Sequence, residues 1–161
     1  MSCTPRRETN PKLSRLHWED FEVGDVFPAP WGRTVTEAHL LSFGGVNGDF
    51  QHMHVDELYA QATEFGGRIA HGNLIAALGL GMQVYTQVFH HVIALLEERH
   101  VYKGAVRIGD TVLSTMTVVE SRPTHKPDRG ILLLRNDLTN QDNELVCEST
   151  YTMMMRRRAT A

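Results

Sequence analysis

The apolar positions in the middle of the chain follow the spacing of a helix. Within residues 73–88, Leu74, Leu78, Met82 and Tyr85 fall on one stripe, which is the period of a helix with one buried face. Small residues occupy much of the remaining surface, so this helix is expected to pack closely against a sheet. The apolar stretch is interrupted by polar side chains and is shorter than the roughly 20 residues that span a bilayer, which predicts a buried helix.

Two shorter helical segments are expected before this one. Thr36 is placed to start a helix that ends at the glycine pair 44–45, and helical spacing of apolar residues returns over 55–65. Residues 47–54 between them form a polar, histidine-rich loop, and a short strand is expected at residues 26–27.

The second half of the chain changes to the spacing of strands. Alternating or β-rich runs cover residues 92–103, 111–121, 131–139 and 145–155, and turn-forming residues separate them. Four consecutive strands of this kind predict an antiparallel meander.

A short strand, a long apolar helix and four antiparallel strands make an α+β layout in which the sheet must wrap the helix. This is the shape of a single hotdog fold, and 161 residues suffice for one such domain. We place the domain at residues 16–158, after a flexible lead-in of residues 1–15. The open edge of such a sheet is commonly closed by a second copy, so a homodimer is expected, with assembly beyond the dimer left open.

The composition and the N-terminal sequence argue against nucleic acid and membranes as partners. A formal net charge of -3 gives no long-range field that would gather nucleic acid, so no nucleic-acid partner is expected. The first twelve residues have no apolar core of a secretory signal, and no membrane association is expected. Cys3 and Cys147 suggest no disulfide framework, which favours a reducing, cytoplasmic location.

Two segments carry groups suited to catalysis. Residues 47–56 hold two carboxylates, two imidazoles and two amides directly before a helix, and loops of this type present catalytic groups from a rigid scaffold. Residues 65–72 lead through a glycine-bearing turn to the start of the long helix, where free backbone N–H groups point outward.

These groups match the needs of water addition to a double bond conjugated to a thioester. Such a reaction needs a base for the water, a proton for the adjacent carbon, and donors for the developing enolate oxygen. Asp49 and His54 are suited to share the water and its proton, and the backbone N–H of Gly72 is suited to the oxyanion. Taken alone, however, Asp49 is as often a turn cap, and His54 is more often a core or surface histidine.

The motifs resemble those of one known family. The pattern made by residues 48–49, 54–56, 65–66 and 69–72 is similar to that of the MaoC-like, (R)-specific enoyl-CoA hydratases. Residues 102–111 also resemble the strand and Gly-Asp-Thr hairpin of that family.

The resemblance covers roughly residues 18 to 155 and implies an activity. It implies that Asp49 and His54 hold the water, that the Gly72 amide polarises the thioester carbonyl, and that a homodimer hydrates a trans-2-enoyl-CoA reversibly to an (R)-3-hydroxyacyl-CoA. No cofactor is implied, because coenzyme A is part of the substrate. The chain departs from the family at Gln51-His52, where Asn-Pro is frequent, and at Ala105, where proline is frequent.

Further residues of these motifs are candidates for substrate contacts. They are Gln51, Arg68, His71 and Asn73, and Arg68 and Lys103 are the candidates for the nucleotide phosphates. No metal is expected, because the acidic and histidine side chains of residues 49–56 do not suggest a closed set of ligands.

Two other functions remain open at this point. Hotdog domains also act as thioesterases, so fold alone does not choose between hydration and hydrolysis. A protein that binds acyl-CoA without turning it over is the third alternative.

Overall fold

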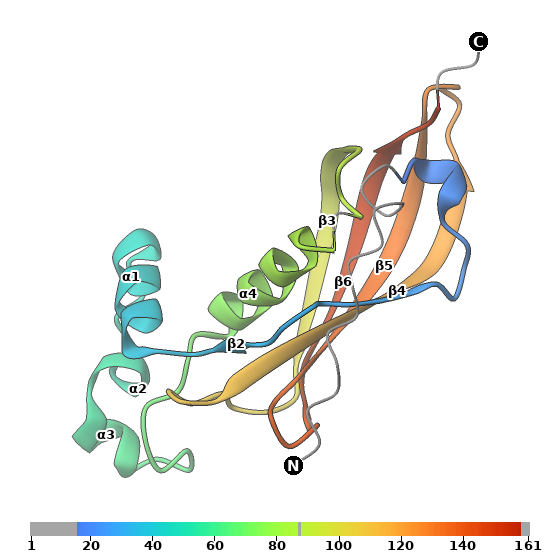
Figure 1. Ribbon diagram of the computed structural model, residues 1–161. Coiled ribbons are helices and arrows are strands. Elements are labelled where there is room, and N and C mark those ends of the chain that lie inside the picture. The colour runs from blue at the N-terminus through green and yellow to red at the C-terminus, as the bar shows by residue number, and fades with distance from the viewer. Residues whose placement is uncertain (1–15, 87, 159–161) are drawn as a thin grey trace.

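The computed structural model describes residues 16–86 and 88–158 (Figure 1). The predicted lead-in at residues 1–15, with Cys3, lies outside the described residues. Cys147 is a buried free cysteine.

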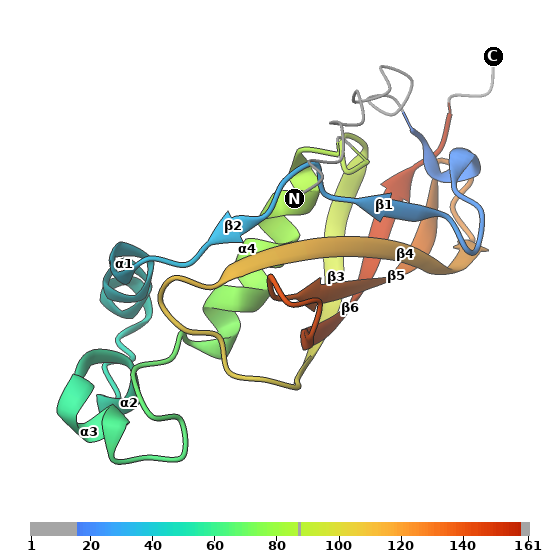
Figure 2. The same cartoon turned by 60° about the horizontal axis from the view of Figure 1, so that its bottom comes forward.

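The chain forms one antiparallel sheet of six strands. The order along the sheet is β1-β4-β5-β6-β3, and β2 also pairs with β4. Figure 2 shows β1 and β2 side by side with β4. The strands are β1 (Val26–Pro28), β2 (Arg33–Thr34), β3 (Val92–Tyr102), β4 (Thr111–Pro123), β5 (Arg129–Thr139) and β6 (Leu145–Arg156).

The predicted meander is correct for three of its four strands and wrong for the first. β4, β5 and β6 follow one another as neighbours, whereas β3 pairs with β6, with Tyr102 opposite Cys147. The reason lies in residues 103–110, which leave the ladder after β3 and bridge to the chain before the long helix through Ile69 and Arg107. As a result β4 does not pair with β3, and β5 and β6 lie between them in the sheet.

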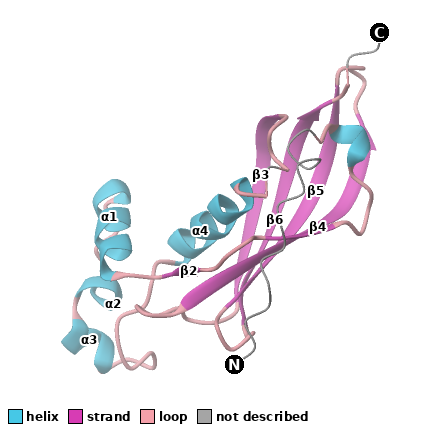
Figure 3. Cartoon of the chain, in the orientation of Figure 1, coloured by secondary structure: helices cyan, strands magenta, loops and turns pink. Residues whose placement is uncertain are grey.

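The described residues also form four α-helices and one 3-10 helix, and none of these is long and apolar enough to cross a membrane. They are η2 (Trp18–Asp20), α1 (Glu37–Asn47), α2 (His52–Val55), α3 (Glu57–Gln61) and α4 (Gly72–Val84). Figure 3 shows α4 along the sheet and α1 to α3 grouped beyond its N-terminal end. We call α1 to α3 the arm.

The helix boundaries differ from prediction where a residue has a second use. α1 continues through the glycine pair and ends at Gly48, which has the left-handed φ of 80°. Gly44 instead allows close packing, because a Cβ there would lie 3.0 Å from the Phe50 ring. The helix predicted over residues 55–65 is interrupted at Asp56, whose side chain caps α3 by accepting from the backbone N–H of Tyr59.

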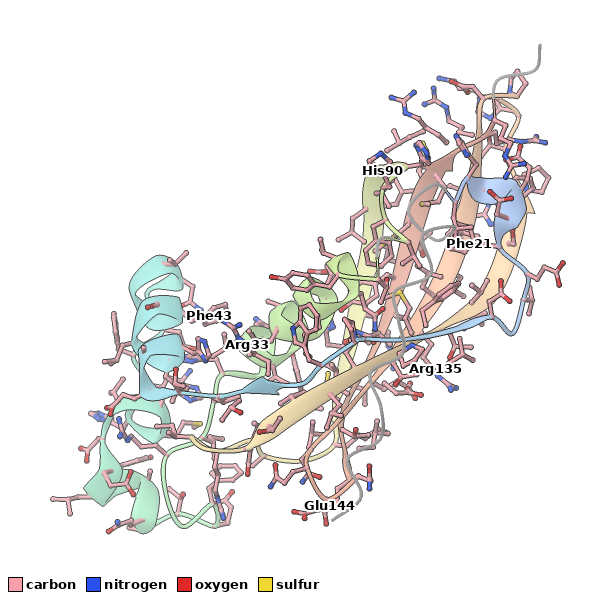
Figure 4. All side chains as sticks on the ribbon, in the orientation of Figure 1. Phe21, Arg33, Phe43, His90, Arg135 and Glu144 are labelled. Atoms are coloured by element: carbon pink, nitrogen blue, oxygen red, sulfur yellow. The ribbon has the colours of Figure 1, made fainter. Side chains whose placement is uncertain are left out.

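The core lies between α4 and the inner face of the sheet. Gly79 approaches β5 so closely that an added Cβ would lie 2.3 Å from Leu138, which confirms the packing demand inferred from the small residues of this helix. Arg135 lies on the opposite, solvent-facing side of the sheet, where it pairs with Asp137 (Figure 4).

The core also contains polar side chains that the hydrophobic pattern did not predict. Gln83 of α4 donates to the hydroxyl of Ser114 at 2.9 Å, and that hydroxyl lies 2.8 Å from the Asn136 amide oxygen. Gln83 and Asn136 are completely buried. These contacts join α4 to β4 and β5 by hydrogen bonds as well as by apolar packing.

Candidate active site

A cavity of about 650 Å³ opens where the arm meets the start of α4. Residues of 47–54 form one wall, the first turn of α4 forms a second, and residues 102–106, which begin with the last residue of β3, form a third. Phe43 lies on the side of α1 that faces α4 and belongs to the same lining (Figure 4). Segments that are distant in sequence therefore meet at one hollow.

Asp49 stands in this cavity on a loop that is organised by its own polar groups. The Asn47 side-chain oxygen accepts from the backbone N–H of Asp49 at 2.8 Å. One carboxylate oxygen of Asp49 accepts from the backbone N–H of Gln51 at 3.3 Å. Gln51 thus contacts the carboxylate through its backbone, while its exposed side chain, a predicted substrate contact, lines the cavity.

His54 faces the same cavity from α2 and is buried. Its Nδ1 lies 2.8 Å from the backbone oxygen of Ile69. A carbonyl oxygen only accepts hydrogen bonds, so Nδ1 carries the proton and Nε2 keeps the lone pair. The fold therefore fixes the tautomer in which Nε2 is the reactive nitrogen.

His71 lies directly behind these two residues. Its ring stacks on that of His54, with centroids 3.8 Å apart and planes 29° apart. Its Nε2 lies 2.9 Å from the backbone oxygen of Asp49, and the Phe43 ring lies 5.2 Å away. The sequence predicted that His71 contacts the substrate, and the structure brings it into contact with both candidate catalytic residues.

Gly72 begins α4 beside them. As the first residue of the helix, its N–H has no intrahelical acceptor and is available to a ligand. A Cβ at this position would lie 2.8 Å from the ring of Tyr102. Glycine is therefore required for the aromatic ring to lie on the start of the helix.

Tyr102 is a cavity residue that we did not single out from the sequence. Its hydroxyl donates to the side-chain oxygen of Asn73 at 2.7 Å. Desolvation, with smaller contributions from nearby acidic groups, raises the pKa of this phenol, which keeps it protonated as a donor. Its position at the end of a predicted strand, directly before Lys103, was the available signal.

Arg68 lies apart from the cavity lining. Its guanidinium pairs with Glu37 at 2.8 Å and with Glu57 at 3.1 Å, and so ties α1 to α3. Nε and one terminal nitrogen of Arg68, which was predicted to bind substrate phosphates, are thus directed at carboxylates of the arm. Lys103, the other candidate for the phosphates, does line the cavity.

Replacing Arg68 with methionine is expected to lower the midpoint of thermal unfolding while leaving the KM for an acyl-CoA unchanged. Methionine keeps the apolar stem and removes both ion pairs, each of which contributes modestly at a partly exposed site. Calorimetry and steady-state kinetics would test this expectation. An increased KM with unchanged stability would restore the phosphate-binding role.

Asp56 and His52, which also belong to residues 47–56, make local contacts outside the cavity. Asp56 caps α3 by accepting from the backbone N–H of Tyr59. His52 is exposed, lies 4.0 Å from the Asp56 carboxylate and packs beside Tyr59. Neither lines the cavity.

Asp49, His54 and His71 are the described residues that come nearest to a metal site. One ligand atom from each lies within 4.8 Å of the others. One nitrogen of each ring faces a backbone carbonyl, which leaves the other nitrogen of each ring for a ligand or a water molecule.

A single water molecule fits the chemistry of this group. Two polar atoms up to about 5 Å apart can be bridged by one water at ordinary hydrogen-bond distances. The Asp49 carboxylate and a nitrogen of His54 meet that condition. Gly72, the first residue of α4, lines the same cavity, so the site combines a carboxylate, an imidazole and a helix N-terminus.

Comparison with known proteins agrees with this geometry. Residues 20–134 match the model of the MaoC-like domain. The chain is 36% identical over 112 residues to an (R)-specific enoyl-CoA hydratase of Rhodospirillum rubrum, a match that covers 69% of this chain and 76% of the relative.

Solved structures share the fold. A MaoC-like dehydratase from Rhodospirillum rubrum has a TM-score of 0.80 and 30% identity, covering 91% of this chain and 100% of its own. A Mycobacterium tuberculosis protein described as having a double hotdog fold has a TM-score of 0.81 and 22% identity, covering 92% of this chain and 46% of its own. The predicted α+β hotdog fold is thereby confirmed.

Proposed function

Since this chain belongs to the MaoC-like dehydratase family, we propose that it is a hydro-lyase that reversibly hydrates a trans-2-enoyl-CoA to an (R)-3-hydroxyacyl-CoA. The observation that carries the proposal is the meeting of Asp49 and His54 in a cavity lined by the first residue of α4. The (R) configuration follows the name of the relative from Rhodospirillum rubrum.

In the proposed reaction the Asp49 carboxylate and His54 Nε2 hold one water molecule between them. The water oxygen bonds to C3 of the enoyl group as the catalytic pair takes one of its protons. The electron pair of the double bond moves toward the thioester oxygen, where the Gly72 N–H stabilises the negative charge. The proton is then delivered to C2, so that one molecule of water is added and the pair returns to its starting state.

No cofactor is required by this scheme, because coenzyme A is part of the substrate and the chain supplies each acid, base and donor. Asn73 and Gln51 line the cavity and are proposed to contact the substrate. The expectation of a cytoplasmic location rests on cysteine usage and stays a prediction.

The test follows two products of one reaction mixture. With crotonyl-CoA and a longer enoyl-CoA, the proposed activity removes the ultraviolet absorbance of the conjugated thioester without releasing free thiol. Release of coenzyme A would instead identify a thioesterase. Binding without either change would identify an acyl-CoA-binding protein and contradict the proposal.

We also propose a homodimer formed through the free edge of β3. β3 ends the sheet, and Leu95 and Leu96 on it are 42% and 50% exposed. An unpaired edge strand with exposed apolar side chains favours pairing with another chain. The match to one half of a double hotdog protein supports the same arrangement.

Light scattering is expected to give a solution mass of twice the 18.2 kDa chain. Replacing Leu96 with glutamate should shift the protein toward the monomer, because it places charge at the proposed contact. A monomeric mass for the unaltered protein at micromolar concentration would contradict the dimer.

A further inference from the structure

His71 is almost completely buried, with 2% of its surface exposed, and it contacts the loop, the helix and the ring that together make the site. We infer that His71 is a positioning residue, which holds the Asp49 loop and the His54 ring in the arrangement that binds the attacking water. This inference rests on the proposed hydratase function and assigns His71 no contact with the substrate.

The hydrogen bond from His71 is a long-range anchor for the Asp49 loop. The bonds that Asn47 and Gln51 make to Asp49 join residues two positions apart, so they shape the loop without fixing its place. The bond between His71 Nε2 and the Asp49 carbonyl joins residues 22 positions apart. It therefore connects the loop to the start of α4, where the Gly72 N–H is located.

The tautomer of His71 follows from its partners. The Asp49 carbonyl only accepts, so Nε2 carries the proton that is donated to it. Nδ1 is buried and has no hydrogen-bond partner among the described residues. The hydrogen bond that His71 makes is therefore directed at the Asp49 loop.

Stacking adds a second constraint, on His54. The His54 ring is held at Nδ1 by the Ile69 carbonyl and on its face by His71. Phe43 packs near His71 and supports it from α1. A ring restrained at one edge and one face keeps Nε2 in a single direction, which is the condition for sharing a water with a carboxylate.

Two substitutions separate the hydrogen bond from the packing. His71→Phe keeps a ring against His54 and removes the donor to Asp49, whereas His71→Gln keeps an N–H donor. We expect His71→Phe to lower kcat by about 10- to 100-fold with little change in KM, because the loop is misplaced by a fraction of an ångström. His71→Gln should recover a large part of that loss. His52→Gln, at an exposed histidine outside the cavity, is the control and should match the unaltered protein.

A readout independent of turnover comes from nitrogen NMR of the imidazoles. In the unaltered protein His54 should show one tautomer, with the proton on Nδ1, and His71 one with the proton on Nε2. His71→Gln, which removes the ring that stacks on His54, should broaden the His54 signals, whereas His71→Phe should leave them sharp, at unchanged thermal stability. This measurement tests the positioning role even if the protein hydrates none of the enoyl-CoA substrates.

Three results would overturn the inference. They are an unchanged kcat in His71→Phe, a raised KM at constant kcat in that variant, and a His54 spectrum that His71→Gln does not alter. If the unaltered protein fails to hydrate any enoyl-CoA while the spectra change as expected, the function is wrong and the positioning of His54 by His71 stands.

Discussion

Replacing Asp49 with asparagine is expected to lower kcat for hydration of an enoyl-CoA by about 100- to 10,000-fold, the range of a lost general base. Asparagine keeps the shape of the side chain and its place beside the Gln51 backbone N–H, but it cannot accept a proton from water. The KM should change little, because the substrate contacts remain. Stopped assays of the conjugated thioester would measure the loss.

The chain offers a matched control in Asp56→Asn. Asp56 lies in the same segment and caps α3 through an oxygen that asparagine retains, so this variant should keep its activity. His54→Ala should lower kcat as much as Asp49→Asn does. The double variant should lower kcat little further, because the effects of residues that act as one unit are not additive. Equal activity of Asp49→Asn and Asp56→Asn would remove Asp49 from the mechanism.

The substitution Gly79→Ala is expected to destabilise the protein relative to Gly81→Ala by about 1–3 kcal/mol, the usual cost of overpacking a core. Both changes gain the same helix propensity on α4, so the comparison isolates packing. At Gly79 a Cβ would lie 2.3 Å from a terminal carbon of Leu138, which is itself fully buried and has little room to move. At Gly81 no atom lies within 4 Å.

Urea denaturation at a fixed protein concentration would measure both variants, with the solution mass checked in parallel because oligomer stability depends on concentration. Gly81→Ala should equal or exceed the unaltered protein in free energy of unfolding. Equal stability of the two variants would mean that β5 yields to the added methyl group.

The meeting of Asp49 and His54 in one cavity was predictable because its signal is local. Asp49 and His54 are five residues apart, and their spacing, together with the glycine at the helix start, carries the resemblance to the family. The position of Arg68 was less predictable. Its ion pairs with Glu37 and Glu57 join residues 31 and 11 positions away, and no sequence pattern distinguishes a cation that ties two helices from one that binds phosphate.

The fold was predictable where periodicity decides it. The long helix and the four strands appear at nearly their expected residues, because alternation and helical spacing are properties of consecutive residues. The placement of β3 beside β6 depends instead on where residues 103–110 lead the chain. The hydrogen bond between Gln83 and Ser114 could not be predicted for a related reason, because each residue appears in the sequence only as a single polar position within an apolar run.

The location of β3 has a consequence for how the site comes into being during synthesis. β3 pairs with β6, and the backbone N–H groups of Lys103 and Gly104 both donate to Val146 of that strand. A nascent chain therefore carries Asp49, His54 and α4 well before it holds the strand that anchors the third wall of the cavity. Pairing across such a separation is slow compared with local structure. A chain released before β6 would possess both candidate catalytic side chains but not the complete cavity, so the proposed activity would require a completely folded chain.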